Sequence, residues 1–233
     1  MLKNHFVIAL RNLKRFKGFS FINIAGLAVG ITCSITLFLF VLDDLSYDRF
    51  NKLSDQTYRL FVNVSINGKE SINSKTASPL GATLAMQYPE VVTYTRIGYF
   101  GSRRFRYQDK DFRVGKIYAA DSTFFDVFTL PFIEGNQRTA LIRPNTLVVT
   151  ESAARKYFGA ESPVGKVLHT EDGRDLLLTG LMKDFPANSH FSCEFLESLT
   201  SYAESQNQRW LDLRIATYIV LRKDCDARAF EKK

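Results

Sequence analysis

The feature that most constrains this chain is an apolar run at residues 19–42, FSFINIAGLAVGITCSITLFLFVL, which contains no Asp, Glu, Lys or Arg. As an α-helix, these 24 residues would rise about 36 Å, which exceeds the ~30 Å hydrocarbon core of a bilayer. A helix suits that environment because its backbone donors and acceptors pair within the segment. The run therefore predicts a transmembrane helix.

The charges on the two sides of this run differ in sign. Acidic residues follow it, whereas the residues before it are basic: Lys3, Arg11, Lys14, Arg15 and Lys17. Basic residues stay on the cytoplasmic side of a membrane. We therefore expect a bacterial inner-membrane protein with a cytoplasmic N-terminus, these five residues as cytoplasmic-side anchors, and residues 43–233 in the periplasm.

Two other interpretations of the run fit less well. A cleaved signal peptide also begins with basic residues, but its apolar segment spans about 7–15 residues and ends at a small-x-small cleavage site. The residues after the run, Asp43-Asp44-Leu45-Ser46-Tyr47, offer no such site. A buried helix of a soluble protein rarely stays free of charge for so long.

The overall charge reflects this topology. The net charge is +7, but the first 42 residues hold five basic residues and no acidic one, which leaves 26 basic against 24 acidic residues in the rest. A nearly balanced outer part gives no support to nucleic acid as a partner, since that function needs a basic face on the folded domain. Its length suits one domain of ordinary size or two small lobes.

The residues before the membrane run also show a helical pattern. Leu2, Phe6, Leu10 and Leu13 recur at helical spacing among basic residues. We expect residues 1–18 to form an amphipathic helix along the inner membrane surface, in contact with membrane lipid and broken near Gly18. A continuous extension of the membrane helix fits the pattern equally well.

Inside the membrane run, small residues recur every fourth position at Gly26, Gly30 and Ser34. Small side chains along one stripe let a second helix approach closely, so they predict a helix-packing face. The alternative is that glycine is simply common in membrane helices.

The outer part has the pattern of an α+β domain. Alternation and an abundance of β-forming residues predict a strand at residues 58–66. Further strands are expected at residues 70–76, 91–100, 103–107, 112–119, 145–150, 164–169, 176–182, 191–196 and 216–221. Helical patterns cover residues 78–88, 121–128 and 150–158, the last with a cap at Thr150-Glu151-Ser152. A further helix begins at Ala227 and has no end signal, so we expect a fragment of a longer chain.

The sequence holds no recognisable constellation for catalysis or for a metal or cofactor. The three histidines, at positions 5, 169 and 190, are far apart, and the three cysteines, Cys33, Cys193 and Cys225, lack metal-ligand spacing. We take the cysteines as small buried residues, although Cys193 and Cys225 could pair in an oxidising compartment. The basic run Arg103-Arg104-Phe105-Arg106 is typical of a solvated strand edge. We expect no enzyme activity and no cofactor.

Several segments together resemble the MacB/FtsX-type ABC transporter permeases, in the form common in the Bacteroidetes. They are RNLKRFKGFSFINIAGLAVGIT around the membrane entry, YDRFN after it, YPEV and TRIG, TESAARKYFG from Thr150, PVGK from Pro163, and KDFPANSHF from Lys183. The resemblance covers nearly the whole chain.

This resemblance implies a first transmembrane helix followed by a periplasmic core domain. That domain has a porter-like lobe, about residues 58–97 and 186–233, and an inserted β-rich lobe, about residues 98–185. It also implies a dimer with a second permease subunit, a separate cytoplasmic ABC ATPase subunit as partner, and mechanotransmission, in which closure of the ATPase moves the outer domain. A membrane-anchored sensor is the alternative function, and it predicts a ligand-sized apolar pocket.

The expected topology can be tested with protease added to intact spheroplasts. We expect digestion beyond Leu42 and protection of the first 17 residues, because only the former lie outside the membrane. Immunoblots against tags at the two ends of the chain would give the result, with lysed cells as the control. Protection of the outer part with loss of the N-terminus would invert the topology.

Overall fold

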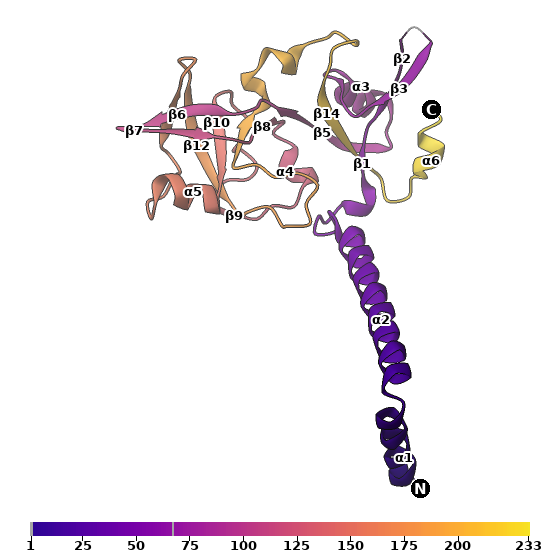
Figure 1. The fold of residues 1–233 in the computed structure, drawn as a ribbon. Coiled ribbons are helices and arrows are strands. Elements are labelled where there is room, and N and C mark those ends of the chain that lie inside the picture. Colours follow the sequence, from indigo (N-terminus) through magenta and orange to yellow (C-terminus); the bar gives the residue numbers. More distant parts are fainter. Residues whose placement is uncertain (1, 67) are drawn as a thin grey trace. The chain divides into compact units, whose positions relative to one another are not determined.

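The computed structural model of the chain describes residues 2–66 and 68–233. The chain forms two compact units, one that ends at Tyr47 and one that spans Asp48–Lys233. Figure 1 shows the helices and strands that make up each unit. The first unit consists of helices and the second is built on a large β-sheet.

The first unit contains the helices α1 (Leu2–Arg15) and α2 (Lys17–Ser46). Among the described residues, α2 is the one helix long and apolar enough to cross a membrane. It is longer than the predicted run because Lys17 and Asp43–Ser46 continue the helix beyond the apolar segment. The hydroxyl groups of Thr32, Ser34 and Thr36 donate to carbonyl groups four residues earlier in the helix, as in the 2.8 Å bond from Thr32 Oγ1 to the carbonyl of Ala28.

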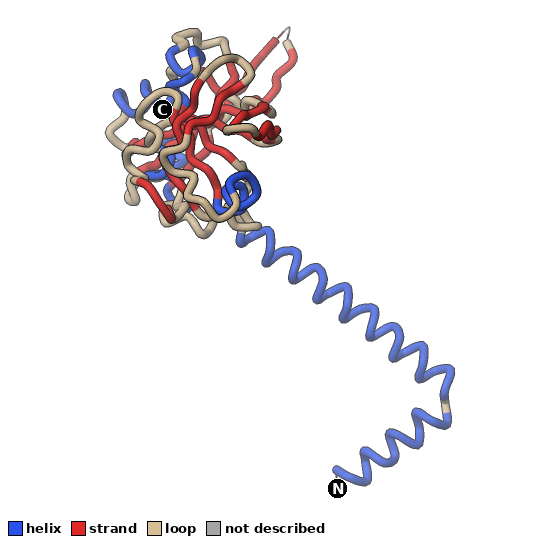
Figure 2. The backbone as a smooth tube through the Cα atoms, turned by 90° about the vertical axis from the view of Figure 1, so that its left-hand side faces the viewer, coloured by secondary structure: helices blue, strands red, loops and turns tan. Residues whose placement is uncertain are grey.

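The break between α1 and α2 lies at Phe16, whereas the sequence suggested Gly18. Phe16 leaves the helical region with φ −108° and ψ 59°, and Gly18 lies inside the first turn of α2. Figure 2 shows the resulting bend between the two helices. The amphipathic segment is therefore a helix of its own and not a straight extension of the membrane helix.

Twelve strands of the second unit form one sheet, in the order β1-β14-β5-β8-β13-β10-β12-β11-β6-β7, with β4 beside β14 and β9 beside β12. Their bounds are β1 Thr57–Arg59, β4 Thr76–Ala77, β5 Val91–Tyr99, β6 Arg103–Tyr107, β7 Lys110–Val114, β8 Ile117–Ala120, β9 Phe132–Gly135, β10 Thr146–Thr150, β11 Val167–Thr170, β12 Asp175–Met182, β13 Phe195–Ser198 and β14 Leu213–Leu221. A separate hairpin joins β2 (Val62–Ile66) and β3 (Lys69–Asn73).

The predicted division into two lobes therefore maps onto one continuous hydrogen-bonded sheet. The strands assigned to the porter-like lobe, such as β14 and β5, pair at one end, and β12, β11, β6 and β7 pair at the other. The strand β8 lies in the predicted inserted segment, yet it pairs between β5 and β13. The lobe boundaries themselves stay a prediction.

Short helices cover the sheet on both faces: α3 (Leu80–Gln87), α4 (Phe124–Val127), α5 (Glu151–Phe158) and α6 (Ala227–Phe230), with 3-10 turns at Ser54–Gln56, Leu199–Ser201 and Ala203–Gln206. Neighbouring residues of a strand point to opposite faces. Thr217 of β14 faces α3, where a Cβ on Gly81 would lie 3.1 Å from its methyl carbon. Tyr218 faces the other side, 5.1 Å from the ring of Phe128 just after α4.

Glycine is required at position 81 by this packing. A Cβ there would lie 2.5 Å from the ring of Tyr94, closer than side-chain atoms approach one another. The glycine lowers the intrinsic helix propensity of α3 but lets the helix lie directly on β5 and β14. Packing therefore outweighs propensity in this helix.

A β-α-β unit forms part of the second half of the sheet. The strand β10 runs directly into α5, and after a hairpin through β11 the chain returns as β12, which is parallel to β10. The helix α5 buries Ala153, Ala154 and Phe158 against the sheet. This places the N-terminus of α5 and the carboxyl ends of β10 and β12 at the same edge.

A buried carboxylate connects β13, in the middle of the sheet, to the part of the sheet that contains β6 and β12. Glu197 of β13 is fully buried and accepts hydrogen bonds from Arg103 (2.9 Å), Arg174 (2.8 Å) and the hydroxyl of Tyr202 (2.6 Å). Burial raises the pKa of Tyr202 to about 12, so its hydroxyl stays a donor at neutral pH. Because an unpaired buried carboxylate is costly, these partners hold β6, the turn before β12 and the segment after β13 together.

The secondary structure differs from the prediction in several places, and the predicted strand at residues 58–66 is two strands, β1 and β2, that belong to different sheets. The predicted strand at residues 112–119 is two strands, β7 and β8, separated at Gly115-Lys116. The strand predicted at residues 191–196 begins only at Phe195, and β9 was not predicted. The basic run lies on β6, second from the edge, because β7 forms the end of the sheet (Figure 1). The cysteines are free, with Cys193 buried, Cys225 half-buried and Cys33 exposed on α2.

Replacing Glu197 tests how much the buried carboxylate contributes. We expect Glu197→Ala to lower the free energy of unfolding by about 3–5 kcal/mol, since it leaves Arg103 and Arg174 without their buried partner. The exposed Glu171 is the control, and its replacement by Ala should change stability by less than about 0.5 kcal/mol. Urea denaturation followed by near-ultraviolet circular dichroism gives both values, and equal effects would contradict the expectation.

Candidate functional site

The residues predicted to matter in the membrane all lie in the first unit. Gly26, Gly30 and Ser34 lie on one face of α2, and a Cβ on either glycine would meet no atom of the described chain. Ser34 Oγ donates to the carbonyl of Gly30 over 2.9 Å, so this hydroxyl is satisfied inside its own helix. The stripe is thus open to a second helix, and its use as a packing face stays a prediction.

The predicted anchors lie on both helices. Arg11, Lys14 and Arg15 are exposed on α1, and Lys17 is the first residue of α2. The side chain of Lys3 lies outside the described residues. Their cytoplasmic location stays a prediction.

The structure reveals a polar site that the sequence did not predict, at the start of the second unit. Two residues after α2 ends, the backbone N–H of Asp48 donates to the carbonyl of Asn188 over 2.9 Å. The carboxylate of Asp48 accepts from the backbone N–H of His190 (3.2 Å) and contacts its ring Nδ1 (2.7 Å). Nε2 of the same ring lies 2.7 Å from the hydroxyl of Tyr218 on β14. We call Asp48, His190 and Tyr218 the junction network.

The junction network has an internally consistent arrangement of protons. A neutral imidazole protonated at Nδ1 donates to Asp48 and accepts at Nε2 from the Tyr218 hydroxyl, so every polar group has a partner. Burial raises the pKa of Tyr218 to about 12, which keeps this hydroxyl protonated at physiological pH. The network therefore forms a chain of hydrogen bonds from the first residue of the unit to β14.

The backbone of Asp48 is constrained as well. Its φ of 58° lies in the left-handed region, which residues other than glycine seldom adopt. The turn that follows is held by Asn51, whose backbone N–H and side-chain amide both donate to the carbonyl of Asp48. The side-chain oxygen of Asn51 accepts in turn from the backbone N–H of Thr129, over 2.9 Å. The chain after α2 is thus fixed to two separate parts of the domain, residues 188–190 and Thr129.

Sequence reasoning had no signal for this site beyond the motifs themselves. YDRFN contains Asp48 and KDFPANSHF contains His190, but the two residues are 142 positions apart. Tyr218 lies in a predicted strand, where its outward or inward direction follows only from the sheet it joins. The sequence offered only the presence of a carboxylate and a histidine in turn-rich segments as a signal for a polar site. The fold brings the two side chains together.

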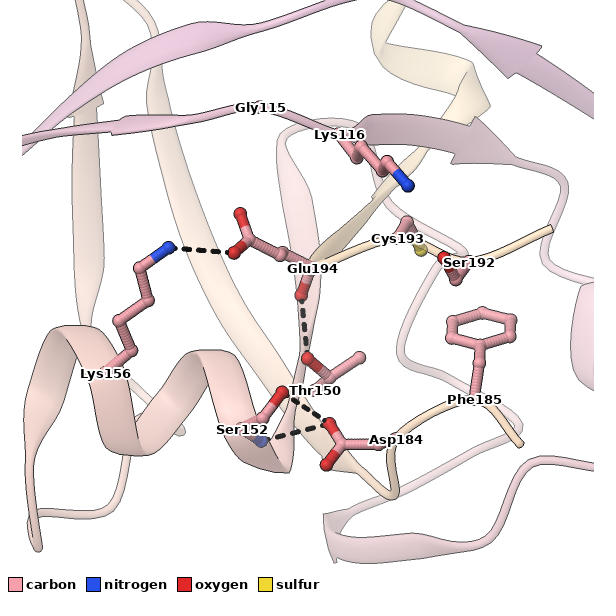
Figure 3. Close-up of a pocket in the computed structure, with 10 residues that line it drawn as sticks. All are labelled: Gly115, Lys116, Thr150, Ser152, Lys156, Asp184, Phe185, Ser192, Cys193 and Glu194. Carbon is pink, nitrogen blue, oxygen red and sulfur yellow. Dashed lines mark hydrogen bonds and ion pairs between the residues drawn. The ribbon is translucent and has the colours of Figure 1, made fainter. Parts of the chain in front are cut away.

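A cavity of about 520 Å³ lies at the carboxyl ends of β10 and β12 (Figure 3). Asp184 closes one side and caps α5, since its Oδ1 accepts from the N–H and the hydroxyl of Ser152 at 3.0 and 2.7 Å. The predicted cap residue, Thr150, instead directs its hydroxyl toward the carbonyl of Glu194 at 3.4 Å. On the opposite side, Lys156 and Glu194 form a 2.9 Å ion pair.

No candidate metal centre accompanies these features. Within residues 2–66 and 68–233, no three His, Cys, Asp or Glu side chains come close enough together to hold a metal ion. Cys193 lies beside the cavity, and burial raises the pKa of its thiol, which favours the protonated and unreactive form.

The proton on Tyr218 gives the junction network a measurable pH dependence. Because the folded-state pKa of about 12 exceeds the ordinary value of 10, the unfolded chain loses this proton first as pH rises. The resulting stabilisation, up to about 3 kcal/mol, is complete below pH 10 and disappears between pH 10 and 12. We expect Tyr218→Phe to remove this part of the alkaline decline and to cost about 1 kcal/mol at pH 7.

Urea denaturation at a series of pH values measures both effects. The control is Tyr99→Phe, since Tyr99 is an exposed ring on the neighbouring strand β5 and its replacement should leave the decline intact. An unchanged alkaline decline in Tyr218→Phe would show that this hydroxyl does not contribute.

Comparison with known proteins shows that other solved structures share this fold. No curated protein matches the sequence. Among solved structures, a permease-protein domain from Porphyromonas gingivalis aligns with a TM-score of 0.71 and 21% identity, covering 78% of this chain and 79% of that one. The periplasmic region of MacB from Actinobacillus actinomycetemcomitans gives a TM-score of 0.56 and 18% identity, with 77% and 81% of the two chains covered.

The extracellular domain of the ABC-type transporter YknZ from Gram-positive bacteria also shares the fold, with a TM-score of 0.52, 14% identity, and 76% and 87% of the two chains covered. At these identities the structures show a common fold. The match in sequence is broader, because residues 20–233 fit the MacB-like periplasmic core domain along their whole length. This chain therefore belongs to the MacB-like periplasmic core domain family.

Proposed function

We propose that the chain is the first span and periplasmic domain of an ABC transporter permease subunit that works by mechanotransmission. In this mechanism, a cytoplasmic ABC ATPase subunit closes on ATP, and the membrane helix passes that movement to the outer domain. Family membership and the fold shared with transporter domains support the permease assignment. Export, efflux and lipoprotein release are all compatible with such a device.

The observation that carries the proposal is the junction network. A helix end transmits force to a domain only where the connection is stiffer than the domain's own motions. Here the connection from α2 to Asp48 is a single residue, Tyr47, and Asp48 is bonded at once to Asn188 and His190. The ring of His190 then continues to Tyr218 in β14, which pairs with β1 on one side and β5 on the other. A displacement of Asp48 therefore reaches the sheet through bonds and not through a flexible linker.

The proposal includes a location and partners. The domain lies in the periplasm, anchored by α2 in the inner membrane with the N-terminus in the cytoplasm, where the basic residues of α1 contact membrane lipid. A second permease subunit packs against the stripe at Gly26, Gly30 and Ser34 to form the dimer. We further propose that the domain is not an enzyme and that catalysis belongs to the ATPase.

A membrane-anchored sensor is the second candidate, and the cavity of Figure 3 is the observation that favours it. The predicted sensor pocket was apolar, whereas this cavity has charged walls that include Lys156, Asp184 and Glu194. In a sensor, occupancy of the cavity alone would change the membrane helix. In a permease, nucleotide on the cytoplasmic side would change the outer domain.

The test uses the complete permease assembled with its ATPase in lipid nanodiscs. We expect binding of a non-hydrolysable ATP analogue to change amide hydrogen exchange in β14 and in residues 184–194, because movement of α2 reaches them through the junction network. Mass spectrometry of peptic fragments measures that change. His190→Ala should reduce it by at least about half while leaving ATP affinity intact, since it removes two of the network's bonds.

His169→Ala is the matched control. His169 also contacts a carboxylate, that of Asp175 at 2.6 Å, but it lies exposed on β11 away from Asp48. This variant should respond to the analogue as the wild type does. No response to nucleotide in the wild-type domain would exclude mechanotransmission, and an equal response in His190→Ala would exclude the junction network as its route.

A further inference from the structure

The cavity of Figure 3 contains one cation whose charge is not matched by a protein partner. Of its four charged side chains, Lys156 and Glu194 neutralise each other at 2.9 Å, and the hydroxyl of Tyr157 adds a 3.3 Å bond to Glu194. Asp184 faces the N-terminus of α5, whose partial positive charge and N–H groups offset its own charge. Lys116 forms no ion pair or hydrogen bond through its ammonium group with any described residue, and it extends toward the cavity (Figure 3).

Two groups beside Lys116 define what else a ligand would meet. The ring of Phe185 is half-exposed at the cavity wall. Its centroid lies 5.2 Å from that of the Phe191 ring, against which it packs. The exposed hydroxyl of Ser192 lies next to it and has no hydrogen-bond partner within the described chain. Gly115 adds no side chain, and a Cβ there would meet open space. A cation, a hydroxyl donor and an aromatic wall suit an anion attached to an apolar body.

Part of the cavity wall is formed by the segment that is hydrogen-bonded to Asp48. Residues 184–194, which we call the return segment, form no helix or strand. Asp184 and Phe185 at its start and Ser192 and Glu194 at its end line the cavity. Between them, Asn188 and His190 hold Asp48 through the hydrogen bonds at the start of the second unit. A ligand that bridges the two ends of the return segment would restrict the residues between them.

We propose that this cavity binds a small organic monoanion with an apolar body, its anionic group on Lys116 and Ser192 and its body on Phe185, and that occupancy rigidifies the return segment and hence the junction network. The regulatory part rests on the proposed function, because it matters only if the junction network carries motion. The binding part stands without it. A molecule bound here stiffens the connection through which the membrane helix moves the outer domain.

The binding part is tested on the full chain in lipid nanodiscs, with no ATPase present. The probe is para-trifluoromethylbenzoate, followed by fluorine NMR, with empty nanodiscs as the blank. We expect a saturable shift, and dissociation constants about fivefold higher both for the neutral para-trifluoromethylbenzamide and for Lys116→Met, which keeps a long side chain but loses the charge. Lys223→Met, at an exposed lysine away from the cavity, should bind as the wild type does.

The coupling part is read from amide hydrogen exchange of the same samples. Saturating benzoate should slow exchange at residues 186–191 in the wild type and in Lys223→Met, and not in Lys116→Met. A shift that does not saturate, or that Lys116→Met leaves unchanged, would overturn the site. Binding through Lys116 with no change in exchange would overturn the coupling. Neither outcome depends on nucleotide, so failure here is distinct from failure of the mechanotransmission test.

Discussion

The pairing of β13 is the constraint on which the rest of the domain depends. This four-residue strand lies between β8 and β10, parallel to the first and antiparallel to the second, and all four of its residues are buried. Its peptide groups have no access to water, so they must be satisfied by the two neighbouring strands. Phe195 packs into one hydrophobic cluster and Leu196 into the other. Without β13, the backbone hydrogen bonds of the sheet would be interrupted between β8 and β10.

The return segment gains its importance from this position. It leads from β12 directly into β13, so its end is fixed by a fully buried strand. Its middle holds Asp48, the first residue of the second unit, through the junction network. An irregular segment can carry out this task because its contacts, and not a helix or strand, define its conformation. The ring of Phe191 supports it by packing against Phe124 and Phe128.

Much of the fold could be predicted from the sequence because it rests on local patterns. The strand-forming residues of β5, β10 and β14 and the apolar face of α5 are visible in the sequence itself, and so is the apolar run of α2. The errors arose where tertiary contacts override a local pattern. FSCEFL alternates from Phe191, yet the strand begins at Phe195, because the residues before it serve the return segment and the cavity. The four residues of β9, just after Pro131, were too few to show a period.

The site could not be predicted in the same way. Asp48, His190 and Tyr218 come from a turn, an irregular segment and a strand, and nothing local marks them as neighbours. Their contact follows from the order of strands in the sheet, which propensity does not determine. The motifs that suggested the family contain two of the three residues. The family motifs therefore contain Asp48 and His190, but only the fold shows that these residues contact each other and Tyr218.

The composition of β7 has a consequence for how such domains behave when crowded. β7 is the last strand of the sheet, and no other described strand pairs with its outer edge, so another chain could pair there. Its sequence alternates charge with apolar side chains, with Lys110, Asp111 and Arg113 exposed. Molecules tethered in a plane collide edge to edge far more often than free ones do. The charges on the edge of β7 oppose pairing between neighbouring copies of the domain. Stable association is then limited to other surfaces of the protein.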